Sequence, residues 1–233
     1  MADIELTAAD GHTFAAYRAD PTGPPRGGVV VIQEIFGVNA HIRSVTDRFA
    51  AAGYVAMAPA LFDRVERGVE LGYDEPSKTK GVGIAWRKLT VNTAIADLEA
   101  TADALSHEVG GAQRVGGVGF CFGGMLAAAL VSRSTQHLWA AVAYYPSRAA
   151  KVLTHDIPGR PLMIHLGDND KGVTIQDGRT LAARWPNAAI HRYPTAGHGF
   201  NCDLRPEFDP DASRQAWDRT LHFLDRHLAK PQP

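Results

Sequence analysis

The chain has 233 residues, of which 45% are hydrophobic and 21% are charged, and its formal net charge is −1. This size predicts one globular domain, residues 1–233, with a sizeable core. The balanced charge, without a basic stripe, argues against nucleic acid as a partner. No apolar run approaches the roughly 18 residues of a membrane span, and no secretory signal opens the chain. We therefore expect no membrane partner and a cytoplasmic protein, a reducing compartment that suits its two cysteines.

The first twenty residues differ in pattern from the rest. Residues 4–6 and 13–17, joined by Asp10-Gly11, predict an antiparallel hairpin at a sheet edge. After them, short apolar runs alternate with helical patterns. The predicted strands are 27–32, 54–58, 114–119, 139–145, 161–167 and 189–193. The predicted helices are 39–52, 84–105, 124–131, 175–185 and 213–228, the last with Ser213 as its cap.

This alternation predicts an α/β fold with a mostly parallel central sheet and helices on both faces. The polar, weakly periodic segment 61–83 reads as a loop over the active face, with room for a short helix. In open parallel sheets, ligands bind beyond the carboxyl ends of the strands. Residues that directly follow predicted strands are therefore the candidates for chemistry.

The segment Gly119-Phe120-Cys121-Phe122-Gly123 carries the clearest motif. It reads Gly-x-nucleophile-x-Gly, the sharp strand-to-helix turn of α/β-hydrolases, with cysteine in place of serine. The following helix points its positive end toward the sulfur, which favours the thiolate that attacks. Cys121 is therefore the predicted nucleophile. The alternative is a structural cysteine, since free cysteines are commonly buried.

An acid and a base follow later strands. His198 lies between glycines after the last predicted strand, and Asp168 and Asp170 follow the strand before it. Nucleophile, acid and histidine then occur in the α/β-hydrolase order. The imidazole takes the thiol proton and returns it to the leaving group, while a carboxylate holds the imidazole tautomer. Both aspartates also suit turns, so the pattern leaves the choice between them open.

The loop at residues 33–39 follows the first core strand. Glu34 stands beside apolar Ile35 and Phe36, which predicts a partly enclosed carboxylate. Backbone N–H groups of this loop, together with those after the nucleophile, are expected to form an oxyanion hole.

On residues 33–39, 119–124, 167–170 and 196–200, the chain resembles the dienelactone hydrolase family over essentially its whole length. The resemblance implies an α/β-hydrolase fold and cysteine-dependent hydrolysis of a lactone or small ester, with no cofactor and no metal. Family members cleave enol-lactones such as dienelactone, which form in the breakdown of chlorinated aromatics. We expect a monomer or a small homo-oligomer with a small-molecule substrate.

The resemblance also implies roles for single residues. Cys121, Asp170 and His198 match the triad of the family, which favours Asp170 over Asp168. Glu34 matches a glutamate that accepts the thiol proton when substrate enters. The oxyanion hole matches the backbone N–H groups of Ile35 and Phe122.

The sequence departs from the family where substrate carboxylates are bound by arginine. Four residues after the catalytic histidine, where the family has an arginine that would pair with Glu34, this chain has Cys202. A second expected arginine has no clean match before the long helix, where Lys80, Arg87 and Lys88 are possible substitutes. Cys202 itself could line the pocket, form an oxidation pair with Cys121, or be a buried structural residue. The substrate-binding candidates are Phe36, Tyr145 and Cys202.

Other functions remain as alternatives. A broader carboxylesterase or thioesterase fits the same residues, and a thiol-sensing or ligand-binding module would use Cys121 alone. A dinucleotide site is disfavoured because the third glycine after Gly117 and Gly119 is misplaced. No pair of histidines at metal-ligand spacing and no Cys-x-x-Cys occurs in the sequence.

Overall fold

The computed structural model describes residues 2–229. Within this range one sheet of eight strands has the order β1-β2-β4-β3-β5-β6-β7-β8. The strands are β1 (Ala2–Thr7), β2 (Thr13–Ala19), β3 (Gly28–Ile32), β4 (Val55–Pro59), β5 (Val115–Phe120), β6 (Ala140–Tyr144), β7 (Leu162–Gly167) and β8 (Ala189–Tyr193). β2 pairs antiparallel with β1 and β4, and the strands from β4 to β8 are parallel. The predicted α/β architecture with its N-terminal hairpin is confirmed.

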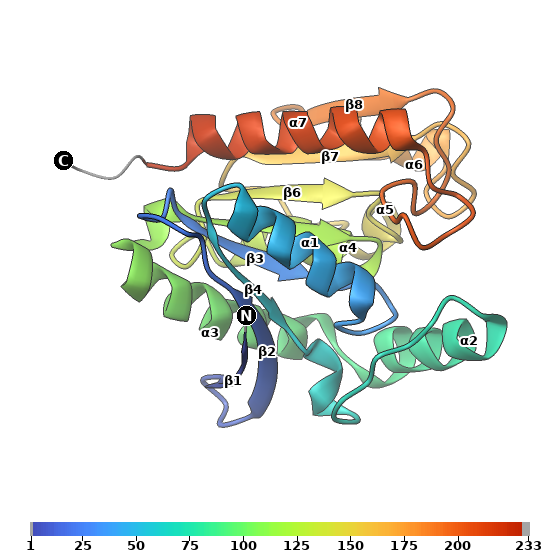
Figure 1. Ribbon diagram of the computed structural model, residues 1–233. Coiled ribbons are helices and arrows are strands. Elements are labelled where there is room, and N and C mark those ends of the chain that lie inside the picture. The colour runs from blue at the N-terminus through green and yellow to red at the C-terminus, as the bar shows by residue number, and fades with distance from the viewer. Residues whose placement is uncertain (1, 230–233) are drawn as a thin grey trace.

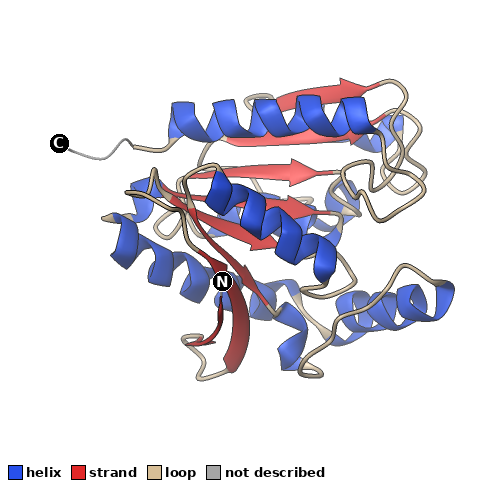
Figure 2. Ribbon diagram, viewed as in Figure 1, coloured by secondary structure: helices blue, strands red, loops and turns tan. Residues whose placement is uncertain are grey.

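Helices cover both faces of the sheet (Figures 1 and 2). The helices are α1 (Ala40–Ala51), α2 (Glu75–Gly83), α3 (Val91–Val109), α4 (Phe122–Arg133), α5 (Ala149–Val152), α6 (Ile175–Arg184) and α7 (Pro210–His227). Figure 1 shows α1 and α7 in front of the sheet, with α3 and α4 behind it. None of the described helices combines the length and apolar character needed to cross a bilayer.

The strands from β3 to β7 in chain order are buried at every position because helices cover both of their faces, and most of their residues are apolar. In β3 every residue is buried: Val29 and Val31 pack in the cluster that includes α1 and α7, while Val30 and Ile32 pack in the cluster with α3 and α4. The parallel pairing of Ile32 with Gly119 brings the carboxyl ends of β3 and β5 to one edge. The loops after these strands therefore meet at that edge.

Two predicted helices need correction. The pattern 84–105 is not one helix: a π-helical turn (Ile84–Lys88) precedes α3, which Thr90 caps through the amide of Thr93. The segment 61–83 contains α2, the short helix for which the prediction left room, and a 3₁₀ turn (Leu61–Arg64). A short 3₁₀ turn (Ala112–Arg114) also precedes β5.

The second correction concerns the start of the last helix. α7 begins at Pro210, and Asp209 caps it by accepting a hydrogen bond from the amide of Ala212. Ser213, predicted as the cap, lies inside the helix and donates its hydroxyl to Oδ1 of Asn201. A proline at the first helical position is favourable because its missing N–H needs no partner there.

Candidate active site

Cys121 occupies a strained turn between β5 and α4. Its backbone has φ 55° and ψ −111°, and α4 begins at the next residue. Two glycines allow the tight packing of this turn. A Cβ on Gly119 would lie 2.0 Å from the carbonyl oxygen of Gly123, and one on Gly123 would lie 2.3 Å from that of Ile32. Strain of this kind is tolerated where surrounding structure fixes it, as at nucleophile turns.

The structure brings the three predicted triad residues into one hydrogen-bonded chain. Nε2 of His198 lies 3.2 Å from Sγ of Cys121, and Nδ1 lies 2.8 Å from Oδ2 of Asp170. Cys121 is 6% exposed and Asp170 is 5% exposed, whereas the side chain of His198 is 22% exposed, so the sulfur and the carboxylate are buried and the imidazole reaches solvent. The three residues follow β5, β7 and β8, whose carboxyl ends lie along one edge of the sheet.

The geometry distinguishes the two candidate aspartates. The second oxygen of Asp170 accepts hydrogen bonds from the amides of Gly172 (2.6 Å) and Val173 (2.8 Å), which fix the carboxylate toward His198. Asp168 instead accepts a hydrogen bond from Nε of Arg192 at 2.8 Å. Asp170 is thus the carboxylate that can orient the imidazole.

The environment of His198 favours the imidazolium. Burial lowers its pKa, but the negative charge of Cys121 and the hydrogen bonds with Asp170 and Cys121 outweigh burial and raise the pKa to about 10. The ring also meets the edge of Tyr145, with ring centroids 5.1 Å apart. A protonated imidazole beside the sulfur is the arrangement that stabilises a thiolate.

Ser147 is a site residue that the sequence analysis missed. Its hydroxyl oxygen lies 3.2 Å from Sγ of Cys121 and 3.5 Å from Nε2 of His198. It stands three residues beyond the end of β6, another strand that ends at the same edge. Ligands bind beyond the carboxyl ends of parallel strands, and this rule, which indicated Cys121, would have indicated Ser147 as well.

Glu34 is buried beside an arginine from a distant segment. It is 1% exposed, and its Oε1 lies 3.8 Å from Nη1 of Arg205. Arg205 lies seven residues after His198 in the sequence. The family has an arginine beside this glutamate at the position where this chain has Cys202, and here Arg205 lies beside Glu34 instead. Burial lowers the pKa of Arg205, yet the charges of Glu34 and Glu207 more than compensate and raise it.

The two amides predicted to form the oxyanion hole lack protein partners among the residues that the structure describes. Within residues 2–229, neither the N–H of Ile35 nor that of Phe122 donates to a protein acceptor. Phe122 is the first residue of α4, where amides have no partner within the helix. The loop of Ile35 is held by Gln33, whose Oε1 accepts a hydrogen bond from the amide of Leu61 at 3.1 Å.

The three predicted substrate-binding side chains are Phe36, Cys202 and Tyr145, and two of them contact Tyr73. Phe36 packs on Tyr73 with ring centroids 4.7 Å apart, and the thiol of Cys202 donates to the Tyr73 hydroxyl at 3.2 Å. Burial and the charge of Glu34 raise the pKa of Cys202 to about 11. Burial and the charges of Glu34, Cys202 and Cys121 raise the pKa of Tyr145. Tyr145 therefore lies near all three of these side chains.

A second arginine near the nucleophile was also missed. The guanidinium of exposed Arg148 stacks 4.5 Å from the ring centre of Trp86, which meets Phe122 edge-on at 5.0 Å. Among the described residues no carboxylate lies within ion-pair distance of Arg148. Lys80, one of the predicted substitutes, pairs with Glu66 at 2.7 Å, and the other two, Arg87 and Lys88, are exposed.

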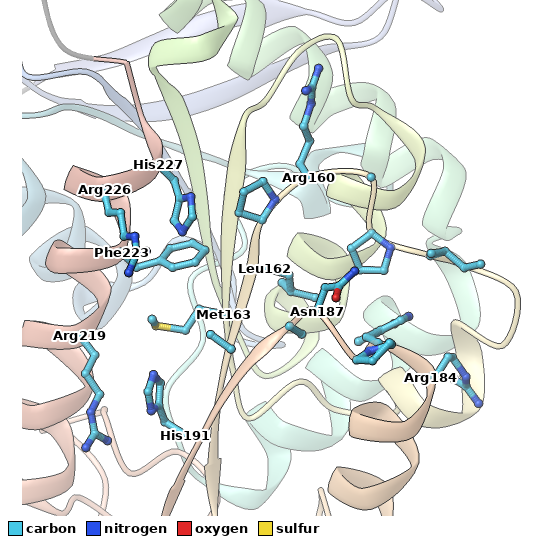
Figure 3. A pocket seen from close by; sticks show the side chains of 18 of the residues that line it. Arg160, Leu162, Met163, Arg184, Asn187, His191, Arg219, Phe223, Arg226 and His227 are labelled. Carbon is cyan, nitrogen blue, oxygen red and sulfur yellow. The ribbon is translucent and has the colours of Figure 1, made fainter.

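A cavity of about 720 Å³ lies at the other end of the parallel strands (Figure 3). It is formed where β7 and β8 begin and where α7 ends, with Met163, His191 and Phe223 among its walls. Arg160 extends away from the cavity and donates to the carbonyl oxygen of Thr135. None of the triad residues lines this cavity.

Known proteins resemble this chain throughout its length. A family model described as the dienelactone hydrolase family matches residues 14–228. Carboxymethylenebutenolidase of Pseudomonas putida is 30% identical, with 95% of this chain and 94% of the relative covered. Carboxymethylenebutenolidase 1 of Cupriavidus pinatubonensis is 32% identical, with 95% of both chains covered. A Klebsiella pneumoniae crystal structure, described as that of a candidate dienelactone hydrolase, has a TM-score of 0.80 at 28% identity and covers 96% of this chain and 99% of its own.

Proposed function

This chain belongs to the dienelactone hydrolase family, and from that premise we propose that it hydrolyses a lactone or small ester through an acyl-enzyme on Cys121. The observation that carries the proposal is the continuous contact from sulfur to imidazole to carboxylate, 3.2 Å and 2.8 Å long. A sensing cysteine needs a reactive thiol but no oriented general base, so the full arrangement supports catalysis.

The resting nucleophile in this proposal is a thiolate paired with an imidazolium. The pKa of His198, raised to about 10, keeps its ring protonated beside the sulfur at neutral pH. The N-terminus of α4, which directly follows Cys121, adds a positive field at the same atom. Asp170 holds the ring through Nδ1, so that Nε2 faces the sulfur.

Acylation then proceeds in two steps. The thiolate attacks the carbonyl carbon, a C–S bond forms, and the carbonyl π pair moves onto oxygen, where the amides of Ile35 and Phe122 stabilise the oxyanion. When the tetrahedral intermediate collapses, the C–O bond to the leaving oxygen breaks, and Nε2 of His198 gives that oxygen its proton. In a lactone the leaving oxygen remains attached through the opened ring.

Deacylation reverses the proton transfer. The neutral imidazole of His198 removes a proton from water as the water oxygen attacks the thioester carbonyl. Collapse of the second intermediate expels the Cys121 thiolate and leaves His198 protonated, which restores the resting pair. Ser147, 3.2 Å from the sulfur, donates a hydrogen bond to the thiolate in this scheme.

Glu34 is a second base in this proposal: in molecules whose Cys121 is still a thiol and not paired as thiolate with His198, Glu34 accepts the thiol proton when substrate enters, as the resemblance implies. Oε1 of its buried carboxylate lies 3.8 Å from Nη1 of Arg205. The charges of Glu34 and Cys121 both raise the pKa of Tyr145, so Tyr145 lies near both side chains. We expect Glu34→Gln to lower the thiolate fraction in the substrate complex. The measurement is the alkylation rate of Cys121 with a substrate analogue bound, and an unchanged rate would count against this role.

For substrate recognition we propose Arg148 as a carboxylate-binding residue. It is exposed, it stacks on Trp86 beside Phe122, and within residues 2–229 it has no carboxylate partner. We expect Arg148→Gln to raise KM for a carboxylate-bearing lactone about tenfold, the loss of one charge-assisted hydrogen bond, and to leave KM for a neutral aryl ester nearly unchanged. Arg87→Gln tests the exposed arginine that the sequence also offered for this role. A rise in KM for the lactone in Arg87→Gln but not in Arg148→Gln, or equal effects of Arg148→Gln on both substrates, would exclude Arg148 from this role.

The test of the proposed activity is hydrolysis of a panel of lactones, aryl esters and thioesters by the wild type and by Cys121→Ala. A preference for carboxylate-bearing lactones supports the narrow function, while comparable rates on neutral esters or thioesters support the broader esterase. Turnover that survives Cys121→Ala excludes the covalent mechanism. A wild type inactive on the whole panel would favour the thiol-sensing alternative.

A further inference from the structure

Three side chains with metal-binding atoms converge beside the proposed catalytic site. Glu34 follows β3, His41 lies in the first turn of α1, and Cys202 lies in the loop after β8. One ligand atom from each lies within 4.8 Å of the others. Their exposed fractions are 1%, 2% and 0%, respectively. Because the three residues come from separate segments, their spacing in the sequence gave no sign of this cluster.

Most of the polar atoms in this cluster lack hydrogen-bond partners. In the described part of the chain, neither oxygen of Glu34 and neither ring nitrogen of His41 makes a hydrogen bond. Buried polar atoms without partners cost about 1–3 kcal/mol each, and native proteins contain few of them. Several at one point indicate a missing partner, either an ordered water or a cation.

We propose that Glu34, His41 and Cys202 bind a zinc ion, with a fourth position left to water, in a state that withdraws Glu34 from the role proposed for it at Cys121. Zn²⁺ takes carboxylate oxygen, imidazole nitrogen and thiolate sulfur together, and three protein ligands with one open position form a recurrent zinc geometry. Tetrahedral bonds of about 2.0–2.3 Å place ligand atoms about 3.3–3.8 Å apart. The ligand atoms of Glu34, His41 and Cys202, which lie within 4.8 Å of one another, would have to approach one another by roughly 1 Å through rotation of their side chains.

The charges of the cluster suit a divalent cation. The carboxylate of Glu34 supplies one negative charge, and metal binding would release the proton of the Cys202 thiol, so that its thiolate supplies a second. Arg205, which lies 3.8 Å from Glu34, has a second carboxylate within reach, because its Nε lies 3.4 Å from Oε2 of Glu207. If Glu34 binds the metal and no longer pairs with Arg205, Arg205 still pairs with Glu207. Hard cations such as Mg²⁺ are disfavoured by the sulfur and the imidazole.

A carboxylate and an access route complete the site. Oδ1 of Asp203 lies 3.4 Å from Nδ1 of His41, and carboxylates next to the ring are common partners of metal-binding histidines. The side chain of Asp203 is 60% exposed, so it links the buried cluster to solvent. It directly follows Cys202, which makes it the natural first contact for an entering cation.

The test uses metal binding by the untagged full chain, in a Cys121→Ser background. That substitution removes the other thiol that could bind metal with His198, and it makes the result independent of the proposed hydrolysis. Co²⁺ is the spectroscopic probe, because cobalt–thiolate coordination gives a charge-transfer band, and Zn²⁺ affinity is measured by its displacement. We expect one Co²⁺ per chain with this band, and competition by Zn²⁺ at equal stoichiometry.

Matched variants locate the site. Cys202→Ser removes the charge-transfer band, Asp203→Asn weakens Zn²⁺ binding about 10–100-fold, and His41→Gln weakens it by more. His222→Gln, an exposed histidine elsewhere, leaves affinity unchanged. Circular dichroism confirms that each variant is folded, and His41→Gln replaces Cys202→Ser if the latter is not. No band in the folded parent, or a band that survives Cys202→Ser, overturns the proposal and leaves a buried water as the missing partner.

Discussion

The carboxyl ends and the amino ends of the parallel strands are surrounded by different side chains. At the carboxyl ends, small buried groups contact one another directly: sulfur, imidazole and carboxylate are linked by contacts of 3.2 Å and 2.8 Å. At the amino ends lies a cavity of about 720 Å³, whose walls, among the described residues, include arginines and histidines but no cysteine and no carboxylate. The chemistry proposed for this chain needs a nucleophile, a base and an acid in contact, and the described residues bring these groups together at the carboxyl ends. The comparison teaches that the volume of a cavity does not by itself indicate where such chemistry can occur.

The largest expected effect is at the sulfur. Cys121→Ala removes the nucleophile and should lower kcat/KM by at least about 10⁴-fold, since loss of a nucleophile costs about as much as loss of a whole triad. Cys202→Ala is the matched control for loss of a buried thiol, and we expect it to cost no more than about tenfold. Steady-state hydrolysis of an aryl ester measures both, and equal losses would remove the distinction between the two cysteines.

Next in size is the carboxylate that orients the imidazole. Asp170→Asn should lower kcat/KM about 10²–10⁴-fold, because the amide cannot hold the productive tautomer. Asp170 also raises the pKa of His198, so the alkaline limb of the pH–rate profile, expected near the pKa of about 10, should move to lower pH in the variant. Asp168→Asn is the control. An alkaline limb that stays in place would mean that His198 is not the group that titrates.

A smaller effect is expected at Ser147. Ser147→Ala removes one hydrogen-bond partner of the sulfur, and a net hydrogen bond of about 0.5–1.5 kcal/mol corresponds to a loss of roughly 2–10-fold in kcat/KM. Alkylation of Cys121 by iodoacetamide at neutral pH should slow by a similar factor. Loss of activity on the scale of Cys121→Ala would instead make the serine part of the essential machinery.

The smallest effect is expected at the amino ends of the strands. Arg226→Gln changes a cationic residue of the cavity wall, far from the triad in the fold, and should alter kcat/KM less than about twofold and stability by less than about 0.5 kcal/mol. Kinetics and urea unfolding measure the two quantities. A large loss of activity in a stably folded variant would contradict the separation of the two ends.

Much of the fold could be predicted because the apolar runs of buried parallel strands are distinctive. The strand at 114–119 and the turn at Cys121 show this best, since every residue of β5 is buried. α2 could not be found by periodicity, because Gly81 is its one buried residue. The helix predicted at 84–105 began too early because its apolar spacing continues through Leu89, where the chain turns before the Thr90 cap of α3.

For the candidate site, the sequence indicated residues that follow strands but not the contacts between distant loops. Cys121, Asp170 and His198 could be proposed because a motif and a chain order mark them. Arg205 could not, since its place beside Glu34 depends on how the loop before α7 folds back over the end of β3. Arg148 was missed for a similar reason: its guanidinium is positioned by the ring of Trp86, from another segment.

The covalent step is tested most directly by trapping the acyl-enzyme. The wild type is quenched in acid during the burst phase of aryl-ester hydrolysis, digested with trypsin, and examined by mass spectrometry. Cys121 and Ser147 fall in different tryptic peptides, 115–133 and 134–148. We predict an acyl adduct on peptide 115–133 that is absent in Cys121→Ala. A burst of phenol with the adduct on peptide 134–148, or with no adduct at all, would contradict nucleophilic catalysis by Cys121.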